Sequence, residues 1–332
     1  MDFMERLYIE PTSACNLQCS MCFRNNWIDE KLGFMSEKVF DEILCSLNDM
    51  PTIKSVMFGG MGEPLLHKNI VAMVSCVAQK NIKAELLTNA TMLNEEMARA
   101  LIKAGLDMLW ISVDGFDRSG YEKIHKGSEF DIIKKNIEYF NKIKGNCKMG
   151  LTFVVMQDNI DELIKVNDFA DMMGFDMINL SYAIPCDPVK TIDSCYDTGF
   201  RIGKQKRVDF SEYHSRKTNH CPFIEEKNCF VKWNGEVVPC MQLLHSSYSY
   251  LYEEKRKIQA KSFGNVESES LAELWDGREY VDFRKRVREF DFPDCTICDG
   301  CDERLANESD CMYNTFPTCG ACLWAQGVGR CP

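Results

Sequence analysis

Residues 7–22 read LYIEPTSACNLQCSMC, a short β-prone run followed at once by three closely spaced cysteines. The cysteines are Cys15, Cys19 and Cys22, so their spacing is C-x3-C-x2-C. Three thiolates this close in sequence can ligate three irons of one [4Fe–4S] cluster and leave the fourth iron without a protein ligand. A structural zinc ion would need four ligands, and no fourth Cys or His lies nearby. This stretch therefore predicts a cluster with one open iron.

Similar short β-prone runs recur along the first two-thirds of the chain and alternate with helical patterns. The helical segments carry boundary signals: Ser36 and Asn94 are candidate N-caps, and Gly105 suits a helix C-terminus. Strands joined by helices imply a parallel sheet with right-handed crossovers, either an open doubly wound sheet or a partial or complete barrel. The predicted strands are Leu7–Glu10, Ile53–Phe58, Ala84–Thr88, Met108–Val113, Gly150–Val155 and Met177–Ser181.

The cysteine loop behind a first strand resembles the radical S-adenosylmethionine (SAM) superfamily, and the resemblance extends through the alternating region. It implies an α/β fold with a partial (βα)6 TIM-type barrel. It also implies that the open iron chelates the amino and carboxylate groups of SAM, and that one electron from the cluster releases methionine and a 5′-deoxyadenosyl radical, which abstracts hydrogen from the substrate. One position departs from the family, which usually has an aromatic residue where this chain has Met21.

Glycine-rich and polar segments follow three predicted strands at the ends where parallel β/α proteins build their sites. The sequence GGMGEP begins at Gly59; its glycines let the backbone approach a ligand, and Glu63 or backbone carbonyls can accept from an ammonium group. Each segment alone is also compatible with an ordinary turn. In the superfamily such positions contact SAM, so the resemblance implies the SAM-binding residues Gly59, Gly60, Gly62, Glu63, Asn89, Ser112 and Asp114.

The C-terminal third contains a predicted β-hairpin between cysteines. Asn234-Gly235 lies between two β-prone runs, which favours a type I′ turn and would bring Cys229 and Cys240 together at the open end of the hairpin. The spacing Cys221-x13-Gly235-x4-Cys240 resembles the start of the SPASM extension, a cysteine-rich domain that holds two auxiliary iron–sulfur clusters in many radical SAM enzymes.

The later cysteines contain a C-x2-C-x2-C run, which is ferredoxin-like because it supplies three cluster ligands and leaves the fourth to a remote cysteine. The SPASM resemblance implies one auxiliary cluster on Cys221, Cys229, Cys240 and Cys322, and a second on Cys295, Cys298, Cys301 and Cys331. The usual SPASM extension reads C-x2-C-x5-C-x3-C, whereas this chain has C-x2-C-x2-C followed by further cysteines. Because of this difference, Cys301, Cys311 and Cys319 compete for one ligand position. A zinc ribbon remains the alternative, because C-x2-C pairs also bind zinc.

Composition limits the partners. The chain has 332 residues, 45% of them apolar, which is enough for a full core, and its formal charge of −11 disfavours nucleic acid. The beginning of the sequence lacks an apolar secretory region and no uncharged stretch reaches the length of a membrane span, so we expect a cytoplasmic protein without a membrane partner. Eighteen cysteines in such a chain indicate metal ligation rather than disulfides.

We expect a radical SAM core over residues 1–200, a linker over 201–214 and a SPASM domain over 215–332. The resemblance implies an enzyme with three [4Fe–4S] clusters and SAM, a one-electron donor such as ferredoxin or flavodoxin, and a substrate that is a peptide, a protein or the cofactor of a partner enzyme. Residues 316–327, FPTCGACLWAQG, resemble more narrowly the maturases associated with tungsten-cofactor oxidoreductases.

Two other functions compete with this interpretation. A non-catalytic iron–sulfur electron carrier or assembly scaffold would also use many cysteines, but it would not need an open iron or polar strand ends along one rim. A tRNA-modifying radical SAM enzyme would need to attract RNA, and the net charge of −11 and the absence of an evident RNA-binding module argue against it.

Overall fold

The computed structural model describes residues 3–28, 30–183, 185–188, 219–251, 253–298 and 300–326. The predicted linker over 201–214 and the predicted ligand Cys331 lie outside these residues. The strands are β1 (Arg6–Ile9), β2 (Ser55–Phe58), β3 (Lys83–Thr88), β4 (Met108–Ser112), β5 (Lys148–Val155), β6 (Met177–Tyr182), β7 (Asn228–Val231), β8 (Val237–Val238), β9 (Ser247–Leu251) and β10 (Glu254–Ile258). The α-helices are α1 (Glu37–Asp49), α2 (Ile70–Ala78), α3 (Glu95–Ala104), α4 (Arg118–Ile124), α5 (Phe130–Ile143), α6 (Val166–Met173), α8 (Pro222–Glu225), α9 (Leu271–Asp276) and α10 (Arg278–Glu289). Short 3₁₀ helices are η1 (Phe23–Asn26), η2 (Pro64–Leu66), η3 (Ile160–Lys165), η4 (Met241–Leu243) and η5 (Asp302–Leu305).

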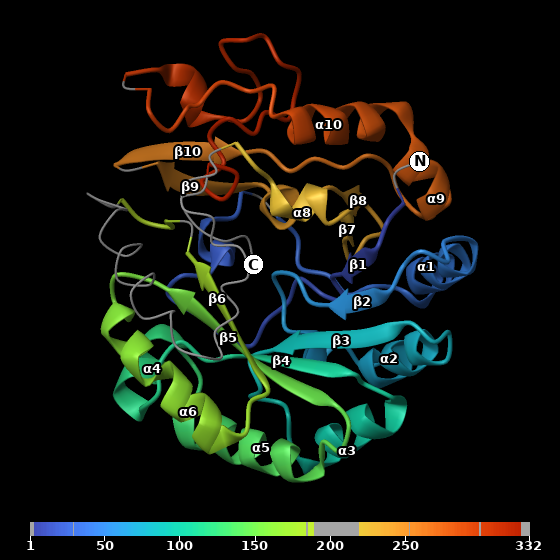
Figure 1. The fold of residues 1–332 in the computed structure, drawn as a ribbon, viewed down its shortest axis with the longest axis vertical. Helices are drawn as coiled ribbons and strands as arrows, with labels where there is room; N and C mark the ends of the chain where they lie inside the picture. Colours follow the sequence, from blue (N-terminus) through green and yellow to red (C-terminus); the bar gives the residue numbers. More distant parts are fainter. Residues whose placement is uncertain are drawn as a thin grey trace.

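The main sheet has eight strands in the order β6-β5-β4-β3-β2-β1-β7-β8. Strands β1 to β6 all run parallel to their neighbours in this order. Helices α1 to α6 wrap around the outer side of the curved sheet, as crossover connections between parallel strands require (Figure 1). The six predicted strands and the α/β fold class are therefore confirmed.

Local signals in the sequence explain where the helices begin and end. The Ser36 side chain accepts a hydrogen bond from the Val39 amide at 3.1 Å, and the Asn94 side chain accepts one from the Met97 amide at 2.9 Å. These caps satisfy amides that the first helical turn leaves unpaired. Gly105 ends α3 with a φ of 90°, a left-handed conformation that glycine adopts without strain. All three predicted boundary residues are confirmed.

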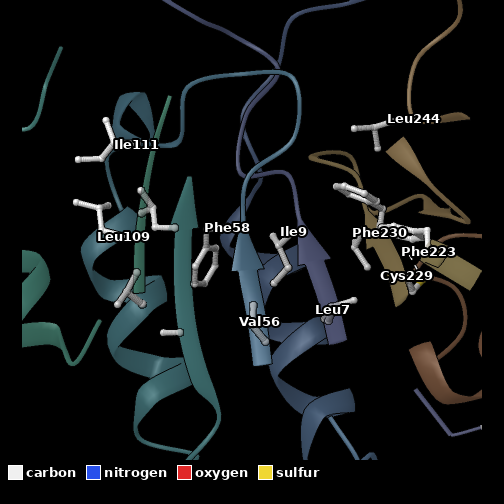
Figure 2. Packing of buried hydrophobic residues seen from close by; sticks show 14 of the residues in the cluster. Leu7, Ile9, Val56, Phe58, Leu109, Ile111, Phe223, Cys229, Phe230 and Leu244 are labelled. Carbon is white, nitrogen blue, oxygen red and sulfur yellow. Dashed lines mark hydrogen bonds between the residues drawn. The ribbon is translucent and has the colours of Figure 1, made fainter. Parts of the chain in front are cut away.

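The apolar core runs without interruption from the parallel strands into the tail. Leu7 and Ile9 of β1, like Val56 and Phe58 of β2, have fully buried side chains (Figure 2). On the other side of β1, Phe230 of β7 belongs to the same buried cluster. Because one core serves both parts of the chain, the tail is packed as part of the barrel body.

Strand β7 extends the sheet on the free edge of β1. The two strands pair in parallel, with Arg6 opposite Asn228 and Ile9 opposite Val231, and β7 then turns back into the antiparallel β8. The sequence places this hairpin in a separate domain. The structure adds that the hairpin belongs to the same sheet as the core.

The turn of this hairpin differs from the predicted type I′ turn, which needs a positive φ at both central residues. Of Asn234 and Gly235, only Gly235 has a positive φ, at 87°. The Gly235 amide donates to the Lys232 carbonyl at 2.9 Å, so Trp233 and Asn234 are the central residues of the turn. Gly235 follows them as the left-handed residue of a bulge. The prediction of a hairpin is confirmed and its turn type was wrong.

The remaining tail elements lie beyond β7 and β8. Strands β9 and β10 form an antiparallel pair, and α10 packs over this region through its buried residues Tyr280, Phe283 and Val287 (Figure 1). The described part of the chain contains no helix with both the length and the apolar character needed to cross a membrane.

Candidate active site and metal centres

The loop with Cys15, Cys19 and Cys22 begins where β1 ends, at the carboxyl edge of the sheet. Backbone hydrogen bonds fix it against the end of α4: the Gln18 amide donates to the Lys126 carbonyl at 3.0 Å, and the Ser20 amide donates to the Ile124 carbonyl at 2.9 Å. These bonds hold the loop without using the three thiols, which remain available to a ligand.

The three thiols of this loop are partly buried and lie close to one another. Burial raises the pKa of Cys19, and the neighbouring Cys22 and Cys15 raise it further. Burial likewise raises the pKa values of Cys15 and Cys22. Metal ions bind the thiolate form and displace its proton. Three mutually close thiols at the carboxyl end of β1 fit a cluster held through three irons.

Two polar side chains, one at the end of β3 and one at the end of α4, contact these thiols. The Asn89 side-chain amide, at the end of β3, lies 3.8 Å from Cys15 Sγ and also donates to the Asn16 side chain at 3.1 Å. His125 Nδ1 lies 3.5 Å from Cys19 Sγ. Hydrogen bonds to ligand sulfurs are one way in which a protein adjusts the potential of a cluster. Sequence reasoning did not select His125, because 106 residues separate it from Cys19.

Asp114 stands behind His125. Its Oδ2 lies 2.8 Å from His125 Nε2, and its Oδ1 accepts a hydrogen bond from the Val154 amide at 2.6 Å. Both side chains are almost completely buried, and the His125 ring stacks on Tyr121. The sequence predicts that Asp114 contacts SAM. In the structure both carboxylate oxygens face the interior, where Asp114 orients the imidazole that reaches Cys19, and a contact of Asp114 with SAM stays a prediction.

The glycine-rich turn after β2 packs directly on the cysteine loop. A Cβ atom at Gly62 would lie 2.0 Å from the Thr12 carbonyl oxygen and 2.6 Å from that of Ala14. The Glu63 amide donates to the same Ala14 carbonyl at 2.8 Å. Gly60 has a φ of 120°, which side chains rarely tolerate. Glycine is therefore required here both by close approach and by backbone conformation.

The Glu63 side chain is buried and accepts three hydrogen bonds from its own chain. The donors are the Thr88 hydroxyl at 2.7 Å, the Asn89 amide at 2.8 Å and the Leu65 amide at 3.0 Å. Burial raises the pKa of Glu63, and these donors oppose that effect. A direct contact of this carboxylate with SAM was one sequence-based prediction. The structure favours the alternative, in which the backbone of the turn meets the ligand and Glu63 holds the turn against β3.

The other predicted SAM residues lie on neighbouring strands of the same edge. Gly59 follows β2 directly, and its amide donates to the Ile9 carbonyl of β1 at 2.9 Å. Ser112 ends β4 and is paired with Thr152 of β5. The structure thus places Gly59, Gly60, Gly62, Asn89 and Ser112 at the carboxyl ends of neighbouring strands, where the cysteine loop also begins, and what each of them binds stays a prediction.

A buried network of charges joins this edge to the tail. Glu10, just after β1, accepts from the Met61 amide at 3.1 Å and pairs with His245 Nε2 at 2.9 Å. The other nitrogen of His245 lies 3.0 Å from Glu30. Burial opposes the charged imidazole, but the hydrogen bonds to Glu10 and Glu30 outweigh it and raise the pKa of His245. No sequence pattern indicated this network, since 235 residues separate Glu10 from His245.

In the tail, four cysteines line one pocket: Cys221, Cys240, Cys319 and Cys322, which we call the first thiol cage. Burial raises the pKa of each of these thiols, to about 12 for Cys240. The neighbouring Cys322, Cys240 and Cys221 raise the pKa of Cys319 further. Four buried thiols around one pocket fit a cluster bound entirely by protein.

Cys229 does not line this pocket, although the sequence predicts it as a ligand. It lies on β7 in the apolar core beside Phe223 and Phe230 (Figure 2). Its thiol points to the Val238 carbonyl at 3.8 Å, and burial raises its pKa to about 12. The hairpin brings the backbone of residue 229 toward Cys240, but side chains alternate between the two faces of a strand. Cys319, and not Cys229, therefore lines this pocket, and which of the two binds a cluster stays a prediction.

A second group contains Cys295, Cys298 and Cys311, which we call the second thiol cage. Burial raises the pKa of Cys295 to about 11, and the neighbouring Cys298 and Cys311 contribute to this increase. Cys301 precedes η5 in the same segment and is partly buried. The two cages adjoin, because the Cys295 amide donates to the carbonyl of Gly320, between Cys319 and Cys322, at 3.1 Å.

Comparison with known proteins agrees with this arrangement. Residues 9–170 match the radical SAM superfamily, and residues 221–302 match SPASM, an iron–sulfur cluster-binding domain. The chain belongs to the radical SAM superfamily and carries a SPASM domain; it is an enzyme whose cofactors are [4Fe–4S] clusters and SAM. The predicted family and cofactors are confirmed.

Two curated relatives cover most of the chain. It is 32% identical to the tungsten-containing aldehyde ferredoxin oxidoreductase cofactor-modifying protein of Pyrococcus furiosus, over 99% of this chain and 97% of that protein. It is 30% identical to a probable GTP 3′,8-cyclase of Methanococcus maripaludis, over 71% of this chain and 84% of that protein.

Solved structures share the fold. SuiB of Streptococcus suis bound to the precursor peptide SuiA has a TM-score of 0.65 at 17% identity, over 86% of this chain and 67% of that one. The enzyme anSMEcpe with bound AdoMet and the Cp18Cys peptide has a TM-score of 0.60 at 20% identity, over 86% of this chain and 83% of that one. At these identities the likeness concerns the fold.

Replacing Gly62 by Ala should displace the turn from the cysteine loop, because the new Cβ would lie 2.0 Å from the Thr12 carbonyl oxygen. We expect the affinity for SAM, measured by equilibrium dialysis under anaerobic conditions, to fall at least about tenfold, equivalent to about 1.4 kcal/mol. Gly120→Ala is the matched control, since the nearest atom to its Cβ would be 3.5 Å away. Equal SAM affinity in the two variants would contradict this role of Gly62.

Proposed function

We propose that this enzyme is a maturase that cleaves SAM reductively and abstracts a hydrogen atom from a peptide, a protein or the cofactor of a partner enzyme. The observation that carries the proposal is the convergence of the Cys15, Cys19 and Cys22 thiols with the glycine-rich turn at one edge of the sheet. A relative aligned over 99% of the chain, named for modifying the cofactor of a tungsten-containing oxidoreductase, supports a partner of that kind.

Each residue at the edge has a proposed task. Cys15, Cys19 and Cys22 hold the cluster, and Asn89 and His125 orient two of the ligand sulfurs. The backbone of residues 60–62 accepts the polar end of SAM. When bound, the cluster and SAM supply the 5′-deoxyadenosyl radical. A one-electron donor such as ferredoxin or flavodoxin provides the reducing electron, and the tail clusters relay electrons or contact the substrate.

For the tail we propose one cluster on Cys221, Cys240, Cys319 and Cys322. The second would use Cys295, Cys298 and Cys311, with Cys301 as its fourth ligand from the same segment; Cys331 lies outside the described residues and remains a predicted alternative. The shared pocket supports the first set, and the mutual influence of the Cys295, Cys298 and Cys311 thiols supports the second.

Replacing Cys15, Cys19 and Cys22 together by Ala should lower the iron content of the reconstituted enzyme from about twelve to about eight per chain, because one four-iron cluster is lost. Formation of 5′-deoxyadenosine from SAM with dithionite should stop. Cys45→Ala is the control, because Cys45 is exposed on α1. If the wild-type enzyme forms no 5′-deoxyadenosine, the electron-carrier function is favoured; if the triple variant forms it at the normal rate, the cluster site is elsewhere.

Single cysteine variants test the first thiol cage. Cys319→Ala should reduce the iron content by up to about four per chain, as should Cys322→Ala, because each removes a ligand of one cluster. Cys229→Ala should keep its iron, since that thiol faces the Val238 carbonyl rather than the pocket. Iron and zinc are measured together by mass spectrometry. Loss of iron from Cys229→Ala alone, or zinc in place of iron, would overturn the proposed ligand set.

The substrate proposal predicts that the pure enzyme forms 5′-deoxyadenosine slowly, because no substrate hydrogen is positioned for abstraction. Adding the apo form of a tungsten-dependent oxidoreductase, or its pterin cofactor precursor, should accelerate formation by about tenfold or more. Deleting the gene should leave that oxidoreductase inactive while its polypeptide is still made. Full oxidoreductase activity in the deletion strain would contradict the tungsten partner, and a modified residue on a short co-encoded peptide would favour a peptide substrate.

A further inference from the structure

Arg256 is a buried cation on β10, with 3% of its surface exposed. Its guanidinium donates from Nε to the Arg304 carbonyl at 2.6 Å and from Nη1 to the Ala321 carbonyl at 2.8 Å. These partners are neutral. No carboxylate of the described residues forms an ion pair with this guanidinium. A buried charge is costly unless an opposite charge lies nearby, so the anion that balances Arg256 has to come from elsewhere.

Cysteine sulfurs from both thiol cages lie near this guanidinium. Arg256 lines the same pocket as the four cysteines of the first cage. Burial lowers the pKa of Arg256 to about 10, and Cys322, Cys295 and Cys319 oppose that decrease. Reciprocally, Arg256 lowers the pKa of Cys295, which belongs to the second cage. The cation therefore faces both sites at which cluster thiolates would carry negative charge.

Backbone hydrogen bonds fix Arg256 between the cages. Its partner Ala321 lies between Cys319 and Cys322, and its other partner Arg304 contacts the Cys298 carbonyl with its own guanidinium. Arg304 pairs with Glu254, so a carboxylate of the chain itself balances the charge of Arg304. Arg256 has no such balance among the described residues, which distinguishes the two arginines.

We propose that Arg256 is a shared counter-cation for both auxiliary clusters and raises the reduction potential of each. The inference rests on the proposed clusters of the two thiol cages. A four-thiolate [4Fe–4S] cluster becomes more negative when it is reduced, so a fixed positive charge nearby stabilises the reduced form more than the oxidised form. The effect is large where the surroundings exclude water and the effective dielectric constant is low. Local charge is an established determinant of cluster potentials.

The test is a redox titration of the reconstituted full-length enzyme followed by EPR spectroscopy. Arg256→Gln removes the charge and should lower the midpoint potentials of both tail clusters. At a fixed potential, the ratio of oxidised to reduced cluster should change by at least about tenfold, which equals about 59 mV for one electron. The SAM-binding cluster should not change. Lys257→Gln is the matched control, because Lys257 neighbours Arg256 on β10 but is exposed and paired with Glu308.

Arg256→Lys separates charge from structure. Lys retains the charge and cannot reproduce the two guanidinium hydrogen bonds, so potentials near those of the wild type support the counter-cation. If Arg256→Gln fails to retain the tail clusters while Arg256→Lys retains them, the requirement for positive charge is likewise supported. Unchanged potentials in an iron-replete Arg256→Gln variant, or equal losses in the Gln and Lys variants, overturn the inference. A wild-type enzyme with only about four irons per chain would instead refute the tail clusters themselves.

Discussion

Two backbone segments meet at Gly62 so closely that a single methyl group does not fit between them, and the active edge depends on this contact. The turn after β2 rests on the start of the cysteine loop, and the Glu63 amide fastens the two together. The Glu63 carboxylate then accepts hydrogen bonds from Thr88 and Asn89 at the end of β3. Three strand ends thus form one rigid unit, which is the preorganisation that a radical enzyme needs to keep water and side reactions from its intermediate.

The buried charges of this protein differ in whether a side chain of opposite charge lies next to them. The chain as a whole is acidic, yet the buried cation Arg256 lies beside sulfurs at which clusters would add negative charge. Two other buried basic side chains have carboxylate partners: His245 lies between Glu10 and Glu30, and Lys232 also pairs with Glu30. The pairing of buried charges follows from their cost in a medium of low dielectric constant. Arg256 departs from this pattern in the described residues, which is why its surroundings are informative.

The sequence predicts correctly those features that depend on a short run of neighbouring residues. The six parallel strands, the caps at Ser36 and Asn94 and the left-handed Gly105 follow from runs of a few residues, where propensity and spacing act directly. Sequence reasoning is less informative where the outcome depends on the direction of a side chain. The spacing of Cys229 and Cys240 placed both at one end of a hairpin, but the face on which each thiol emerges is set by pairing and packing.

Asp114 shows the same limit, because its position at a strand end suggested a ligand and its rotation into the core was invisible in the sequence. His125 and Arg256 were missed for a different reason. Each acts on groups far away in the chain, and no motif records such a contact. Contacts between residues so far apart in the chain become visible only in the folded structure.

The parallel pairing of β7 with β1 has a consequence for how the enzyme is assembled. Strand β7 follows β1 more than two hundred residues later in the chain, so β1 gains its second neighbour only after residues 228–231 have been made. Until then, the backbone of β1 exposes unpaired amides and carbonyls along the edge next to the cysteine loop, and such an edge invites pairing with other chains. Synthesis and cluster insertion therefore face a period in which the loop is present and its neighbouring strand is not. During that period the unpaired side of β1 is the part of the sheet most exposed to pairing with other chains.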